Sequence, residues 1–157
     1  MAAITRFKDG TVIFNVDHSV GKFGRNRRTD VQLVQFLLNK LIQNIKDTGM
    51  GESPLPVPEL LVTDGICGTK TIAAILWCQK SENYWYKGGF KTGAEDSTIN
   101  HVVIYGPNGN ALFYSMWNIQ NHLQSRNALP HTAAEITVQP LGSELEKYFK
   151  MGLVPKI

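Results

Sequence analysis

The chain has 157 residues, of which 43% are hydrophobic and 18% are charged, and its formal net charge is +3. This is the composition of an ordinary globular protein with enough apolar material for a core, so gross disorder is excluded. The charge is too mild for the strong basic stripe typical of nucleic-acid-binding proteins, and we expect no nucleic-acid partner.

The N-terminal residues predict a hairpin followed by a basic loop. Residues 4–16 form two apolar runs around a turn at Gly10, which is the pattern of a β-hairpin. Residues 19–28 are rich in glycine and arginine and predict a loop. The basic residues of this loop are Lys22, Arg25, Arg27 and Arg28. They fit either a solvated loop or a contact with an anionic wall polymer, phosphate or nucleic acid.

A long helix is predicted next. Thr29 and Gln32 have the spacing of a capping box at its start. Apolar residues then recur at steps of three and four, at Val31, Val34, Leu38, Leu41 and Ile45. This period predicts a largely buried helix that ends near Gly49. Residues 51–58 contain three prolines and predict an extended linker.

A second helix is predicted after a glycine-containing turn. Asp64, Gly65 and Gly68 mark a tight turn, in which the Asp64 carboxylate accepts backbone N–H groups and both glycines fit where side chains would be blocked. Thr69 is expected to cap a helix that runs to about Glu82. We expect the N-terminal hairpin and the two helical segments to form one N-terminal unit, residues 1–82.

Residues 83–157 are predicted to form a C-terminal α/β extension packed on that unit. Two strands at 101–105 and 111–117 flank a glycine-rich hairpin loop, and helices follow near 117–126 and after 143. The expected fold class is therefore α+β, with β-hairpins flanking a small helical module.

The two helical segments resemble, in the same order, the two halves of the peptidoglycan-binding-like domain. The first reads Asp-Val-x-Leu-Val-Gln-x-Leu-Leu-Asn from Asp30, and the second reads Asp-Gly-x-x-Gly-x-x-Thr-x-x-Ala-Ile-x-x-x-Gln from Asp64. The likeness covers residues 21–80 and implies a small three-helix module. Gln35 and Gln79, which belong to these motifs, are expected to bond across the helices or to loop backbone.

The resemblance implies a non-catalytic module that binds peptidoglycan, as muropeptide or glycan, in a groove beside the helices. The implied contact residues are Asp64, Thr69, Lys70 and Trp77, since a lysine suits a peptide carboxylate and an aromatic face suits a sugar ring. The aromatic run at residues 84–86 adds Trp85 as a sugar-stacking candidate. No catalytic residue, metal or cofactor is predicted.

Two other functions remain open. The same fold serves protein interaction in related modules, so the chain fits an adaptor or cargo component of a bacterial contractile secretion or phage-like system. A cell-wall hydrolase would need an unrecognised active site in residues 83–157.

The N-terminal charges and the cysteines bear on location. Charges at Arg6, Lys8 and Asp9 interrupt any apolar run after Met1, so no secretory signal is recognised. No apolar run anywhere in the sequence approaches the roughly 20 residues that a membrane span needs. We expect cytoplasmic synthesis, no membrane insertion, and delivery to the periplasm or cell wall by a non-classical route. Cys67 and Cys78 lack a CxxC spacing and predict two reduced thiols, with Cys78 partly buried.

Overall fold

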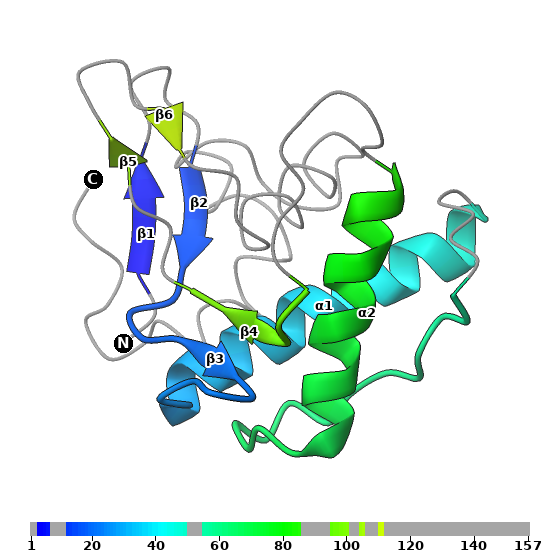
Figure 1. Cartoon of the computed structure of the whole chain (residues 1–157), viewed down its shortest axis with the longest axis horizontal. Helices are drawn as coiled ribbons and strands as arrows, with labels where there is room; N and C mark the ends of the chain where they lie inside the picture. The colour runs from blue at the N-terminus through cyan, green and yellow to red at the C-terminus, as the bar shows by residue number, and fades with distance from the viewer. Residues whose placement is uncertain are drawn as a thin grey trace, which may run out of the picture.

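The computed structural model describes residues 3–6, 12–49, 55–85, 95–100, 104–105 and 110–111. In chain order the elements are β1 (Ala3–Arg6), β2 (Val12–Asn15), β3 (Val20–Gly21), α1 (Arg28–Thr48), α2 (Thr69–Trp85), β4 (Thr98–Ile99), β5 (Ile104–Tyr105) and β6 (Asn110–Ala111) (Figure 1). Helices and short antiparallel strand pairs occur together, which confirms the α+β class. The helices predicted near 117–126 and after 143 lie outside the described residues.

The strands form three antiparallel pairs. β1 pairs with β2, with Ile4 opposite Phe14, so the strands of the N-terminal hairpin are confirmed, while its turn lies outside the described residues. β5 pairs with β6 inside the region where a second hairpin was predicted. β3 pairs with β4, although its residues were predicted as loop. Val20 is fully buried and Gly21 brings its backbone against Ser97, and these contacts make a strand of a segment whose composition favours a loop.

Helix α1 is largely buried, as predicted, but its start differs from the prediction. The N-cap is Arg27, which makes no side-chain capping bond, and Thr29 lies inside the first turn, so the predicted capping box is wrong. The end is confirmed, because Gly49 takes the left-handed conformation (φ 62°) and donates its N–H to the Ile45 carbonyl.

The linker between the helices is held by a side chain of α1. Of the linker predicted over residues 51–58, residues 51–54 lie outside the described residues, and residues 55–58 have no regular secondary structure, nor have the residues that follow to 63. Asn39 pairs with Leu61 as a neighbouring strand would: its Nδ2 donates to the Leu61 carbonyl (2.8 Å) and its Oδ1 accepts the Leu61 N–H (2.7 Å). The amide therefore fixes where the linker crosses α1.

Helix α2 crosses α1 and shares its core (Figure 1). The Ile72 N–H donates to the Gly68 carbonyl (3.0 Å), so Gly68 occupies the capping position and Thr69 is the first helical residue, not the predicted cap. The helix also runs three residues beyond Glu82, to Trp85. Val34 of α1 and Ile75 of α2 are both fully buried. Neither described helix combines the length and the apolar character that a bilayer span requires.

Candidate functional site

The centre of the candidate site is a turn that Gln35 holds against α1. The amide Nε2 of Gln35 lies 3.1 Å from Asp64 Oδ1, 3.1 Å from the Ile66 carbonyl and 3.2 Å from Thr71 Oγ1. Its Oε1 accepts the N–H of Gly65 (2.9 Å). The glutamine is buried, so these bonds form away from water and fix the turn before the first residue of α2.

Gln79 repeats this arrangement on a second turn. Its Nε2 donates to Asp96 Oδ1 (3.1 Å) and to the Thr98 carbonyl (2.9 Å), and its Oε1 accepts the Ser97 N–H (2.9 Å). In both turns the aspartate accepts the N–H two residues on, and the residue between has a positive φ, 78° at Gly65 and 62° at Ser97. The expectation that both glutamines bond to loop backbone is confirmed. The second turn was not predicted, and Asp-Ser in place of Asp-Gly is the sequence signal that would have revealed it.

At only one of the two motif glycines, Gly65, does the structure leave no room for a side chain. A Cβ on Gly65 would meet the Arg28 side chain and lie 2.8 Å from the Arg28 carbonyl oxygen, whereas a Cβ on Gly68 would meet nothing within 4 Å. The prediction that side chains are blocked at both positions is therefore wrong for Gly68.

The two glycines supply a matched test. Gly65→Ala combines a left-handed backbone with a steric clash and is expected to cost about 2–4 kcal/mol of unfolding free energy. Gly68→Ala is expected to cost less than about 1 kcal/mol, because alanine is only a poorer cap than glycine. Urea unfolding of both variants measures the difference. Equal losses would contradict this account of the turn.

The charge state of Asp64 is set by the same contacts. The hydrogen bond from the Ile66 N–H, followed by the one from Gln35, lowers the pKa of Asp64 below its usual value, and Arg28 contributes in the same direction. These bonds therefore favour the carboxylate form in the folded chain.

This lowered pKa predicts a loss of stability in acid. The contribution of the Asp64 carboxylate is fully present above the pKa of an unfolded aspartate, about 3.9, and is lost as the pH falls through the lower pKa of the folded state. Asp64→Asn keeps the oxygen that accepts both bonds but does not titrate. Unfolding curves over this acid range should show the difference between the wild type and this variant shrinking as the pH falls. A constant difference would contradict the prediction.

Lys70 lies beside a pocket at the start of α2. The pocket has a volume of about 200 Å³ and is mostly apolar. Its lining residues are Pro58, Glu59, Leu60, Leu61, Lys70 and Ala73. The linker side is positioned by the Asn39–Leu61 pair, and the other side is the first part of α2, whose entry turn Gln35 holds. An exposed ammonium, a carboxylate and apolar walls therefore meet at one place.

The predicted site residues divide into two groups. Asp64, Thr69 and Lys70 come together around the entry to α2, where Asp64 is half-buried and the other two are exposed. Trp77 lies farther along α2 and is only 7% exposed, and its Nε1 finds no hydrogen-bond partner among the described residues. Its ring therefore offers no open face to a sugar in this structure. Trp85 is the last residue of α2, and its side chain lies outside the described part.

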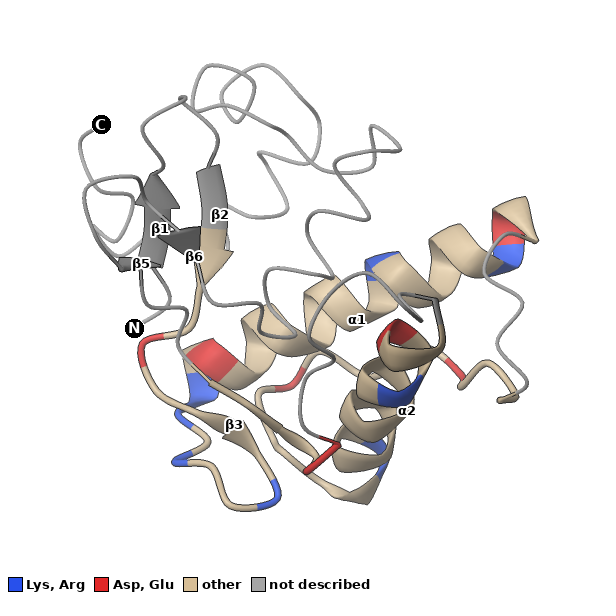
Figure 2. Ribbon diagram, turned by 45° about the horizontal axis from the view of Figure 1, so that its top comes forward, with Lys and Arg blue, Asp and Glu red and all other residues tan. Residues whose placement is uncertain are grey.

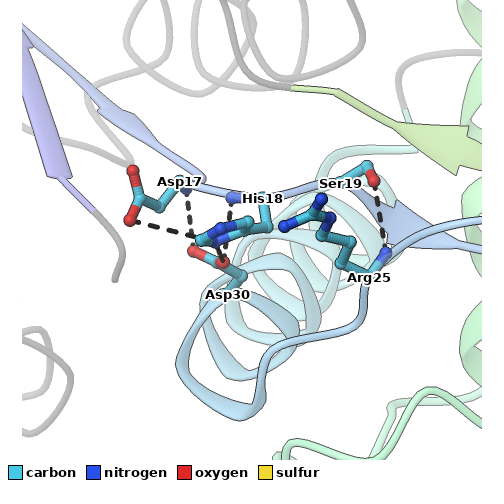
Figure 3. Close-up of polar contacts among 5 residues, drawn as sticks. All are labelled: Asp17, His18, Ser19, Arg25 and Asp30. Carbon is cyan, nitrogen blue, oxygen red and sulfur yellow. Dashed lines mark hydrogen bonds and ion pairs between the residues drawn. The ribbon is translucent and has the colours of Figure 1, made fainter.

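A second polar cluster joins the strands to α1 but lacks the geometry of a catalytic pair. The Asp30 carboxylate is fully buried and accepts the backbone N–H groups of Asp17 (2.9 Å) and His18 (3.0 Å) (Figure 3). His18 Nδ1 is 3.6 Å from Asp30 Oδ2 and 3.8 Å from Asp17 Oδ2, which is too far for a hydrogen bond. The role of Asp30 here is to hold the chain entering β3.

The described residues show no activated thiol and no metal site. Both cysteines are free, as predicted, and Cys78 is fully buried and donates to Glu82 Oε1 (3.3 Å). Burial raises the pKa of both thiols, that of Cys78 strongly, so neither favours the nucleophilic thiolate. No group of three metal-ligating side chains occurs in the part of the chain that the structure describes.

Comparisons with known proteins place the chain in no family. No family model matches the sequence, no curated protein matches it, and no solved structure matches the fold.

Proposed function

We propose that the chain is a non-catalytic binding module for peptidoglycan, and that the pocket beside α2 receives the peptide stem of a muropeptide. The observation that carries the proposal is that Lys70 lines an apolar pocket next to the turn held by Gln35. Lys70 is one of the residues that the family resemblance implies as ligand contacts. The two motif halves also bond to each other through Gln35, as members of one module would. We also propose that residues 21–80 form a peptidoglycan-binding-like module, the small three-helix fold that their two motifs resemble.

The chemistry of the pocket favours a peptide over a glycan. A muropeptide stem offers alanine methyl groups, carboxylates and an amino group, and the pocket offers apolar walls, the Lys70 ammonium and the Glu59 carboxylate. No aromatic ring lines it, so the stacking surface that a sugar ring prefers is lacking there.

A sedimentation assay with purified sacculi, followed by titration with soluble muropeptides, tests the proposal. Lys70→Glu should weaken binding at least about tenfold, because it removes a charge-assisted hydrogen bond and adds a repulsive carboxylate. Lys80→Glu makes the same charge change at an exposed position of α2 outside the pocket and should leave binding unchanged. Failure of the wild type to sediment with sacculi would overturn the proposal.

A protein-binding adaptor is the second candidate, and one observation favours it. The segment that leads into α2 exposes four large apolar side chains, at Val57, Leu60, Val62 and Ile66. Apolar groups gathered on one surface segment are typical of a protein contact. Val62 is 75% exposed and lies outside the lining of the pocket. If a stable partner co-purifies with the wild type and is lost in Val62→Ser, while the wild type does not bind sacculi, the adaptor is favoured over the wall-binding module.

A further inference from the structure

The loop between β3 and α1, residues 22–27, is held in one shape by polar contacts near its base. Asn26 Oδ1 accepts the Gly21 N–H (2.8 Å), and its Nδ2 donates to the carbonyls of Gly21 (3.0 Å) and Gly24 (3.1 Å). The Asn26 N–H donates to the Ser19 carbonyl (3.0 Å), and the Lys22 N–H donates to the Ser97 carbonyl (3.0 Å). The loop therefore keeps its form without burying the large side chains it carries. We call residues 22–27 the basic tip.

The basic tip presents one aromatic ring among cations. Phe23 is 80% exposed, more than any other large hydrophobic residue described. Lys22, Arg25 and Arg27 are exposed around it, and residues 19–29 contain no acidic side chain. Figure 2 shows the blue positions of this loop gathered at one edge of the molecule, next to β3. Among the described residues none of these three cations forms an ion pair that would explain its position.

The placement of Arg27 is unfavourable within the fold itself. It is the N-cap residue of α1, where the helix dipole disfavours a positive charge, and it makes no capping hydrogen bond. Arg28, in contrast, packs close to Gly65, and its charge helps to lower the pKa of Asp64. Arg27 is exposed, so its charge is available to an external anion.

We propose that the basic tip docks the protein on the surface of an anionic phospholipid bilayer. The Phe23 ring enters the boundary between headgroups and acyl chains, and Lys22, Arg25 and Arg27 meet the lipid phosphates. The contact is peripheral and reversible, and it is separate from the pocket beside α2.

The aromatic ring distinguishes a bilayer from other polyanions. A soluble wall polymer offers phosphates but no apolar layer for the phenyl ring of Phe23. Single-stranded nucleic acid stacks on open aromatic faces, but the Lys22 ammonium lies 5.4 Å from the centroid of this ring and occupies one face. A protruding apolar ring surrounded by cations matches the layered chemistry of a lipid surface.

Co-sedimentation with phosphatidylglycerol and phosphatidylcholine vesicles tests the proposal. The full chain should bind the anionic vesicles, and binding should fall on addition of salt. Lys22→Glu should lower the partition coefficient at least about tenfold, since each cation near the surface contributes about fivefold. Phe23→Ser should lower it with no change of charge, and Phe23→Leu should retain most of it.

Matched controls separate the basic tip from general surface properties. Val62→Ser removes another exposed apolar side chain, which is 75% exposed, and Lys80→Glu makes the same charge reversal on α2. Both should bind like the wild type, and all variants should keep its thermal unfolding midpoint. No binding to anionic vesicles, equal binding to both lipids, or equal losses in the controls would overturn the proposal. Retention on a single-stranded oligonucleotide without vesicle binding would overturn it in favour of nucleic acid. Lys70→Glu should reduce binding to sacculi and leave vesicle binding intact, so the two proposals fail independently.

Discussion

Gln35→Leu is expected to lower the free energy of unfolding by about 2–4 kcal/mol, because it leaves the buried Gly65 N–H without its acceptor and removes the amide donor from the buried Thr71 hydroxyl. Leucine is close to glutamine in volume, so the loss reports hydrogen bonds and not a cavity. The side chain is 1% exposed, and its amide serves the turn at Asp64, Gly65 and Ile66 as well as Thr71. The buried Gly65 N–H loses its partner altogether, and water reaches it only if the turn opens.

Gln43→Leu is the control for this prediction. Gln43 is also on α1, but it is exposed and bonds only to Asp47, one helical turn away. Its replacement should change stability by no more than about 0.5 kcal/mol. Urea unfolding at neutral pH measures both variants. A loss at Gln35 as small as that at Gln43 would show that the turn holds its shape without the amide.

Gln35→Leu should also weaken the proposed binding of the muropeptide stem at the pocket beside α2. The hydrogen bonds of the Gln35 amide fix the turn from which α2 starts, and Lys70 is the second residue of that helix. Under conditions where the Gln35→Leu variant is still folded, binding to sacculi should therefore fall even though the ammonium itself is unchanged.

The parts of the fold that were predicted correctly are those that short-range rules decide. The buried stripe of α1 follows from apolar spacing, and its end follows from the ability of Gly49 to adopt a left-handed conformation. The Asp64 turn is equally local, since the carboxylate accepts an N–H only two residues away. Each of these features has a signal in residues close together in the sequence, so a local pattern is enough to predict it.

The features that were missed depend on partners distant in the chain. β3 has only two residues, and its strand partner β4 lies beyond α2. No pattern within residues 19–28 therefore predicts that β3 pairs with β4. Thr29 has good capping chemistry, but the first helical hydrogen bond is accepted two residues earlier in the sequence, by the Arg27 carbonyl. Three side-chain amides hold loops in this fold, those of Gln35, Asn39 and Gln79. The sequence shows that these residues are present, but it does not show in full which loop each amide bonds to.

The residues predicted to contact a ligand differ in exposure, and the sequence could not show this for a related reason. Lys70 and Thr69 are exposed, as contact residues must be. Trp77 was assigned to the ligand because aromatic rings suit sugars, yet α2 is buried around most of its circumference. Its buried polar residues include Thr71, Gln79, Ser81 and Glu82. A helix that buries polar and apolar residues alike has no clear solvent face in its sequence, so spacing cannot separate a core tryptophan from a binding one.

Asp30→Ala is expected to destabilise the fold by roughly 3 kcal/mol, since two backbone donors lose a charged acceptor at once. The carboxylate is fully buried and accepts the N–H groups of Asp17 and His18 at 2.9 and 3.0 Å. It also lies in the first turn of α1, where the helix dipole stabilises a negative charge. Alanine therefore removes the link between the chain entering β3 and the start of the helix.

Two comparison variants make the Asp30 prediction specific. Asp30→Asn keeps one oxygen acceptor but turns an amide N–H₂ toward the second backbone N–H, so its loss should fall between those of wild type and alanine. Asp47→Ala removes an exposed carboxylate from the last turn of α1, where the dipole disfavours it, and should change stability by less than about 0.5 kcal/mol. Chemical unfolding ranks the three variants. If alanine at position 30 were tolerated as well as alanine at position 47, the two N–H groups would have to find other acceptors, and the buried carboxylate would not be what holds the strands to α1.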